Sequence, residues 1–172
     1  QSDADGLKSE FGEAVTPVLF DVADEAAVRA GAAQVAQALG KRRLYGLVNN
    51  AGIAVSGPLL HLDTAELRRQ FEINLFGVHN VTRAFADLLG ADPDRTGKPG
   101  RIVMISSVGG QNGAPFVGPY AASKFALEGY SQSLRRELML YGIDVIVIGP
   151  GAIATPIWDK AESLDISVYA RT

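Results

Sequence analysis

Apolar and polar positions along the chain follow two distinct periods. Short apolar runs predict β-strands at residues 15–20, 44–48, 102–106 and 143–148. Longer segments carry apolar residues spaced by three and four, as on one buried helix face, at residues 24–39, 63–89 and 120–141. Strands that alternate with helices in this way predict an α/β fold built on a parallel sheet.

Local signals sharpen the ends of these elements. Gly40, preceding three basic residues, predicts the end of the first long helix. Asp63, with Glu66 three residues later, predicts a capping box at the start of the next. Pro17 has no amide proton to donate to a ladder, so the strand at 15–20 is expected at an edge of the sheet.

Several segments with potential chemistry follow predicted strands directly. They are Asn49-Asn50-Ala51-Gly52, Ser107 and Pro150-Gly151 with the nearby Thr155. The carboxyl ends of parallel strands share one edge, where open α/β sheets bind ligands, so these segments are expected to surround a common site. Each segment taken alone is also explained as an ordinary turn at the end of a strand.

Tyr120 and Lys124 lie four residues apart at the start of a predicted helix, so their side chains share a face. A tyrosine is a poor acid/base near neutral pH, but an adjacent ammonium stabilises the phenolate form. The alternative is a core tyrosine beside a surface lysine. Asn74 is unusual because asparagine is an indifferent helix former in the middle of an apolar face; its alternative is a solvent-facing position.

Composition narrows the function classes. The 172 residues contain no cysteine, which excludes disulfides, thiolate metal sites and cysteine nucleophiles. The formal net charge of −3 argues against a nucleic-acid partner. The longest uncharged stretch, residues 102–123, is interrupted by glycine and proline and is not expected to cross a membrane.

Taken together, these motifs resemble the short-chain dehydrogenase/reductase family over nearly the whole chain. Asn74, Ser107, Tyr120 and Lys124 match the family's catalytic tetrad in order and spacing, and Tyr120 to Lys124 is a full form of its active-site motif. The resemblance implies a single Rossmann-type domain over residues 1–172, with a doubly wound parallel sheet. It also implies a cytoplasmic NAD- or NADP-dependent oxidoreductase that forms a homodimer or homotetramer.

The resemblance assigns a role to each residue of the tetrad. Tyr120 would be the acid/base on a carbonyl or alcohol oxygen, and Ser107 would hydrogen-bond the same oxygen. Lys124 would bind the nicotinamide ribose and support Tyr120, while Asn74 would position a water for proton relay. The cofactor would also contact Asp21, Val22, Asn49, Ala51, Gly52, Pro150, Gly151, Ile153 and Thr155.

The family's glycine-rich phosphate loop does not occur in the sequence. By the resemblance, the strand at 15–20 corresponds to the family's third, so the first two strands and the last strand are expected to be missing from this chain. We therefore expect a fragment or an incompletely recorded part of a longer enzyme. The choice between NAD and NADP, usually made at the end of the second strand, stays open.

The substrate is expected to be a small molecule, and no metal is implied. Apolar residues near the expected pocket suggest a lipophilic secondary alcohol or ketone: Pro115, Phe116, Val117, Ile157 and Trp158. One alternative is a 3-oxoacyl reductase of the same family. Another is a truncated, non-catalytic chain that cannot hold the dinucleotide, and a third is a regulatory or scaffolding protein.

Overall fold

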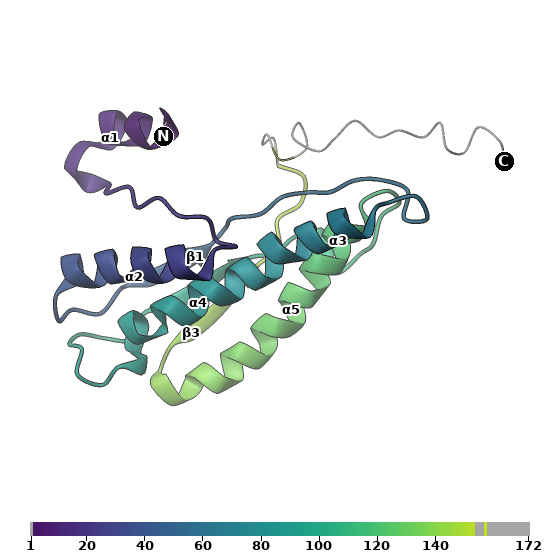
Figure 1. The fold of residues 1–172 in the computed structure, drawn as a ribbon. Helices are drawn as coiled ribbons and strands as arrows, with labels where there is room; N and C mark the ends of the chain where they lie inside the picture. Colours follow the sequence, from purple (N-terminus) through teal and green to yellow (C-terminus); the bar gives the residue numbers. More distant parts are fainter. Residues whose placement is uncertain (1, 154–156, 158–172) are drawn as a thin grey trace.

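The structure, a computed structural model, describes residues 2–153 and residue 157. Its described sheet has three parallel strands in the order β1-β2-β3 (Figure 1). The strands are β1 (Gly46–Asn49), β2 (Arg101–Ile105) and β3 (Asp144–Ile148). Val48 lies opposite Val103, which in turn lies opposite Ile146. The strand ends that follow these pairs therefore meet at one edge.

Helices connect the strands and pack on one face of the sheet (Figure 1). The helix before β1 is α2 (Glu25–Leu39), and α1 (Ser2–Phe11) precedes it with the 3₁₀ turn η1 (Gly12–Ala14). The connection from β1 to β2 contains α3 (Thr64–Phe71), the π-helical segment η2 (Glu72–Gly77), α4 (Val78–Ala86) and a second π segment, η3 (Asp87–Ala91). The connection from β2 to β3 contains the 3₁₀ turn η4 (Val108–Gly110), α5 (Gly118–Leu138) and the 3₁₀ turn η5 (Met139–Tyr141).

The core lies between the sheet and these helices. Strand side chains alternate between faces, so Ile102, Met104 and Val145 are buried against α4 and α5. The other face carries Val48 and Ile148, which are 61% and 46% exposed. Helices α2, α4 and α5 thus cover a single face of the described sheet.

The helix predictions are confirmed. Asp24 caps α2 by accepting hydrogen bonds from the amides of Ala26 and Ala27, and Gly40 ends it with a φ of 58°. Asp63 caps α3 through the amide of Ala65. Glu66, predicted as its capping-box partner, has a carboxylate that accepts from the Arg69 guanidinium. Within the described residues, no helix is both long and apolar enough to cross a membrane.

The strand predicted at 15–20 is wrong: these residues belong to no strand of the described structure. A strand needs a neighbouring ladder, and the described sheet ends at β1 without pairing with this segment. The segment is held by side chains instead. A Cβ added at Gly31 of α2 would lie 2.5 Å from a ring carbon of Phe20, so the glycine makes room for that ring.

The three other strands are confirmed with shifted ends. β1 begins two residues later than predicted and includes Asn49, which was expected in the following turn. The helix predicted at 63–89 is continuous in path but contains π-helical turns, and Asn74 lies in the first of them. Such turns occur frequently at functional sites.

Candidate active site

The carboxyl ends of β2 and β3 are joined by backbone hydrogen bonds beyond the strands themselves. The amide of Ser106 donates to the carbonyl of Ile148 at 2.7 Å, and the amide of Val108 donates to the carbonyl of Pro150 at 2.9 Å. These bonds place Pro150 and the following Gly151 beside Ser107. Two segments predicted from separate strand ends therefore lie together.

Ser107 is held by its own turn. Its Oγ accepts a hydrogen bond of 3.0 Å from the amide of Gly109 and so caps η4. The hydroxyl is buried. Because its oxygen is the acceptor in the bond from Gly109, its proton can still be donated to another acceptor. A Cβ at Gly110 would lie 2.8 Å from Ser106 Oγ and 3.2 Å from the carbonyl of Lys124, so this glycine allows η4 to approach α5 closely.

Tyr120 and Lys124 occupy the first two turns of α5 and are both buried. The ammonium nitrogen of Lys124 donates to the carbonyl of Ile105 at 2.7 Å and lies 5.7 Å from the centre of the Tyr120 ring. Burial lowers the pKa of Lys124 from 10.5 to about 8, because the charged form loses solvation. Tyr120 and Lys124, predicted to share one helix face, therefore lie close together in the structure.

The Tyr120 ring and the Ser107 hydroxyl lie next to each other. A Cβ added at Gly109 would be 3.2 Å from Tyr120 Cε1 and 3.4 Å from Ser107 Oγ, so both groups approach the same point. A cavity of about 160 Å³ opens in front of them. It is lined by Asn50, Gly52, Ile105, Ser106, Ser107, Tyr120, Lys124, Pro150, Gly151, Ile153 and Ile157.

Asn74 lies behind this cavity, only 1% exposed. Its amide oxygen accepts from the amide of Ile53 at 2.9 Å, and its amide nitrogen donates to Ser123 Oγ at 3.2 Å. A Cβ at Gly52 would lie 3.3 Å from the Asn74 oxygen. Asn74 therefore supports the segment after β1 and the first turn of α5 together.

Three of the remaining predicted cofactor contacts lie at a second cavity of about 160 Å³, beside β1. Val22, Asn49 and Ala51 line it. The side chain of Asn49 is turned into the core, where its Nδ2 donates to Thr82 Oγ1 at 3.0 Å. Asp21 is exposed and accepts from the amide of Ala23. Thr155, also predicted to contact the cofactor, lies outside the described residues.

Two buried residues of this region were missed in the sequence. Gln70 is 0% exposed and bonds to the segment after β1, and Ser123 accepts hydrogen bonds from both Gln70 and Asn74. Ser123 stands inside the Tyr120 to Lys124 motif, and Gln70 lies four residues before Asn74. Each of the two residues shares a helix face with a residue of the predicted tetrad, and this spacing is the signal by which the sequence could have identified them.

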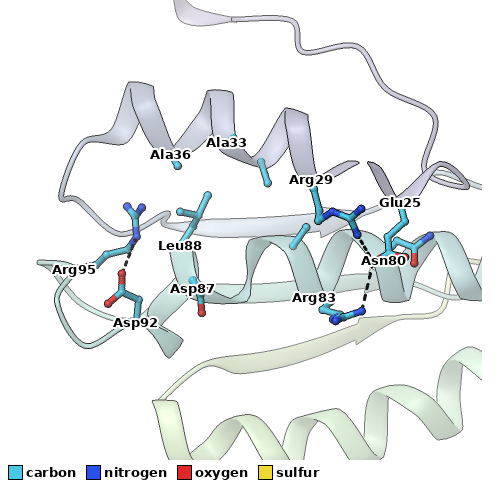
Figure 2. Close-up of a pocket in the computed structure, with 12 residues that line it drawn as sticks. Glu25, Arg29, Ala33, Ala36, Asn80, Arg83, Asp87, Leu88, Asp92 and Arg95 are labelled. Atoms are coloured by element: carbon cyan, nitrogen blue, oxygen red, sulfur yellow. Dashed lines mark hydrogen bonds and ion pairs between the residues drawn. The ribbon is translucent and has the colours of Figure 1, made fainter. Parts of the chain in front are cut away.

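A larger groove, of about 460 Å³, lies between α2 and α4, away from these residues (Figure 2). Its floor contains Ala33, Ala36 and Leu88, and charged side chains stand around it. Among the described residues there is no cluster of acidic or histidine side chains that could hold a metal.

Comparison with known proteins points to one family. A family model described as short chain dehydrogenase matches residues 1–165. The NADPH-dependent 3-dehydrocapnine reductase of Ornithobacterium rhinotracheale is 39% identical over 163 residues, which are 95% of this chain and 57% of that protein.

Solved structures agree with this match. A short chain dehydrogenase/reductase from Burkholderia phymatum in complex with NAD superposes with a TM-score of 0.81 at 28% identity, covering 92% of this chain and 54% of that one. A gluconate 5-dehydrogenase from Burkholderia cenocepacia J2315, in complex with NADP and tartrate, gives a TM-score of 0.78 at 32% identity, covering 91% and 58%. The chain spans about half the length of the curated relatives that it matches.

Proposed function

This chain belongs to the short-chain dehydrogenase/reductase family, and we propose that it carries the catalytic part of an oxidoreductase. The enzyme transfers a hydride between NAD or NADP and a secondary alcohol or ketone. One observation carries the proposal: Ser107, Tyr120 and Lys124 are all buried and line a single cavity at the ends of the parallel strands. Residues 1–172 form part of a single Rossmann-type domain in this proposal.

The proposed roles follow from the positions of the three side chains. Tyr120 gives a proton to the carbonyl oxygen in reduction, or takes one from the hydroxyl in oxidation. Ser107 donates its hydroxyl proton to the same oxygen, which orients the substrate and stabilises developing negative charge. Lys124, when protonated, supports the phenolate form of Tyr120 by its positive charge.

The residues present fit the nicotinamide half of such a cofactor. Lys124 has three N–H donors, of which one is bonded to the carbonyl of Ile105, so others can reach ribose hydroxyls. A Cβ built at Gly151 would meet no atom of the described residues within 4 Å, and Gly151 lines the same cavity as Lys124, so these two residues would hold the nicotinamide side of the cofactor. When bound, the cofactor supplies the hydride. The reductase relative is NADPH-dependent by name, which favours reduction as the working direction.

The proposed substrate is lipophilic on the side facing residues 115–117. Phe116 is partly exposed, and its φ of 66° is rare for a residue other than glycine. Its carbonyl accepts from the amide of Gly57 at 2.8 Å, so the strained turn is tied to the loop after β1. Ile157 lines the cavity itself, whereas residues 115–117 are not among its described lining residues. Trp158, predicted beside it, lies outside the described residues.

A homo-oligomer is part of the proposal. Phe85, Leu88 and Leu138, on the two long helical connections, are buried in the core of the single chain. Phe76 and Phe125 are 51% and 48% exposed and are better candidates for an interface. Light scattering after gel filtration measures the mass in solution, and a mass of one chain would contradict this part.

Titration of the chain with NADH and NADPH tests the function. Nicotinamide fluorescence and melting temperature should both change with one dinucleotide, which would also settle the choice of cofactor. A chain that responds to neither does not hold the dinucleotide, which is the non-catalytic alternative. The variant Lys124→Met should weaken the response, because it removes the proposed ribose contact.

A further inference from the structure

The chain after β1 runs past two side-chain amides of the helix that follows. Asn74 accepts from the amide of Ile53 at 2.9 Å and donates to its carbonyl at 3.1 Å. Gln70 accepts from the amide of Val55 at 2.7 Å and donates to the carbonyl of Ile53 at 2.9 Å. The two amides thus bond to residues 53–55 much as a neighbouring strand would.

The same two amides reach α5. Asn74 donates to Ser123 Oγ at 3.2 Å and Gln70 donates to it at 3.4 Å. Ser123 in turn donates to the carbonyl of Tyr120 at 2.8 Å. Every N–H of the two amides and the one O–H of Ser123 therefore has an acceptor.

Burial makes this set of bonds restrictive. Gln70 and Ser123 are both 0% exposed, so water cannot replace a lost partner. A glutamine can span from α3 to residues 53–55 and to Ser123 at once, whereas an apolar side chain of similar length fills the same space without fixing it. Gln70 therefore sets how the segment after β1 lies relative to the first turn of α5.

We propose that Gln70 is a positioning residue for the reaction. Its bonds to Ile53, Val55 and Ser123 hold the backbone of Tyr120 at a fixed position relative to Gly52. The inference rests on the proposed function, because Gly52 and Tyr120 line the same cavity. Gln70 touches neither substrate nor cofactor in this proposal. It acts through Ser123 on the backbone of Tyr120.

A double-mutant cycle with Gln70→Met and Ser123→Ala tests the route. Gln70→Met should lower kcat about tenfold, on the scale by which small misplacements slow a reaction, while KM for the dinucleotide stays within about threefold because the residue does not contact it. In the Ser123→Ala background the same change should lower kcat by about twofold or less, because the route is already broken. Gln132→Met, an exposed glutamine on α5, is the matched control and should change neither value.

Two outcomes would overturn the proposal: an unchanged kcat in Gln70→Met, or equal effects of that change with and without Ser123. A general loss of folding would instead lower the melting temperature and raise amide exchange throughout β2 and α5.

Hydrogen exchange gives a readout that does not depend on catalysis. Gln70→Met should raise exchange selectively at the amide of Val55 and in the first two turns of α5, and leave β2 protected. Unchanged exchange at Val55 would overturn the proposal. If the wild-type chain binds neither dinucleotide, the proposed function fails, and this exchange pattern alone decides whether Gln70 couples the two segments.

Discussion

The cavity at the strand ends and the groove between α2 and α4 differ in what surrounds their charged and polar side chains. The site at the strand ends is small, about 160 Å³, and two of its polar side chains are buried and bonded to backbone: Lys124 to the carbonyl of Ile105 and Ser107 to the amide of Gly109. The groove between α2 and α4 is larger, about 460 Å³, and its charged groups are bonded mainly to one another (Figure 2).

The two ion pairs that Glu25 makes in the groove are exposed, whereas the side chain of Arg95 is only 15% exposed and also donates to the carbonyls of Gly40 and Arg42. Glu25 pairs with Arg29 and, at 3.5 Å, with Arg83, and Arg95 lies 3.6 Å from Asp92. Exposed pairs of this kind gain little because water and salt screen them. The comparison teaches that cavity size does not identify the site: at the smaller cavity, burial and a fixed backbone partner give Lys124 a defined position and a lowered pKa.

The largest expected difference between the two regions is in turnover. Tyr120→Phe removes the hydroxyl that exchanges the proton and should lower kcat by about 10³-fold, within the usual range for an acid/base residue. Dinucleotide affinity should stay within about threefold, because the phenyl ring keeps the packing. Steady-state kinetics and fluorescence titration measure the two values.

Arg83→Ala, in the groove, is the control for Tyr120→Phe and should leave kcat unchanged. Substantial turnover in Tyr120→Phe would remove that residue from the mechanism. A comparable loss of turnover in Arg83→Ala would break the distinction between the two regions.

The second difference is in how stability depends on pH. Lys124 has its pKa lowered to about 8 in the folded chain, so between pH 8 and its unfolded value near 10.5 the unfolded chain binds the extra proton. Stability should therefore rise with pH in that window, by roughly 2 to 3 kcal/mol up to pH 10. Burial raises the pKa of Tyr130, which gives the opposite slope above pH 10, so the measurement ends there.

Urea unfolding at pH 7, 8, 9 and 10 checks this prediction. Lys124→Met should be more stable than the wild type at pH 7, and its stability should lack the rise. Arg29→Met, which changes a cation of the groove, should retain the wild-type rise. A wild-type stability that is flat from pH 8 to 10 would show that Lys124 keeps its ordinary proton affinity.

Local signals explain which parts of this molecule were predictable. The ends of α2 are set by Asp24 and Gly40, which act on their own turns, so the sequence places them within one residue. The proposed tetrad residues are recognisable because they match the family's motif in order and spacing. Strand pairing is less predictable, because whether residues 15–20 form a strand depends on which segment pairs with them. No local sequence pattern contains that information.

Gln70 and the π-helical turns were missed for a related reason. A glutamine in a helix is typical of a solvent-facing position until the packing around it is known, and Gln70 is buried only because residues 53–55 cross it. The extra residue in the turn at Asn74 likewise adjusts the helix to contacts made elsewhere. Both features depend on tertiary packing rather than on helix propensity.

The third difference compares two asparagines on successive parts of one helical connection. Asn74→Leu leaves the amide of Ile53 without its partner and removes a donor to Ser123 Oγ, and should lower the free energy of unfolding by about 1 to 3 kcal/mol. Asn80 lines the groove, and its Nδ2 donates a single bond of 3.1 Å to the carbonyl of Val22. Asn80→Leu should cost about 1 kcal/mol or less. Equal losses in urea unfolding would mean that the two regions are equally dependent on their polar groups.

The smallest effect is expected at the centre of the groove's charges, Glu25. Its carboxylate pairs with Arg29 and Arg83 while also standing in the first turn of α2, where the helix dipole favours a negative charge. Glu25→Gln alone would mix these contributions, so the pair with Arg83 is isolated by a cycle of Glu25→Gln and Arg83→Gln. We expect a coupling of about 0.5 kcal/mol or less in urea unfolding at low salt, falling toward zero as salt screens the two exposed side chains. A coupling energy above about 1.5 kcal/mol that persists at high salt would mean that the pair of Glu25 and Arg83 is shielded from water, because only a shielded pair keeps such an energy. That result would contradict the distinction between the groove and the buried site.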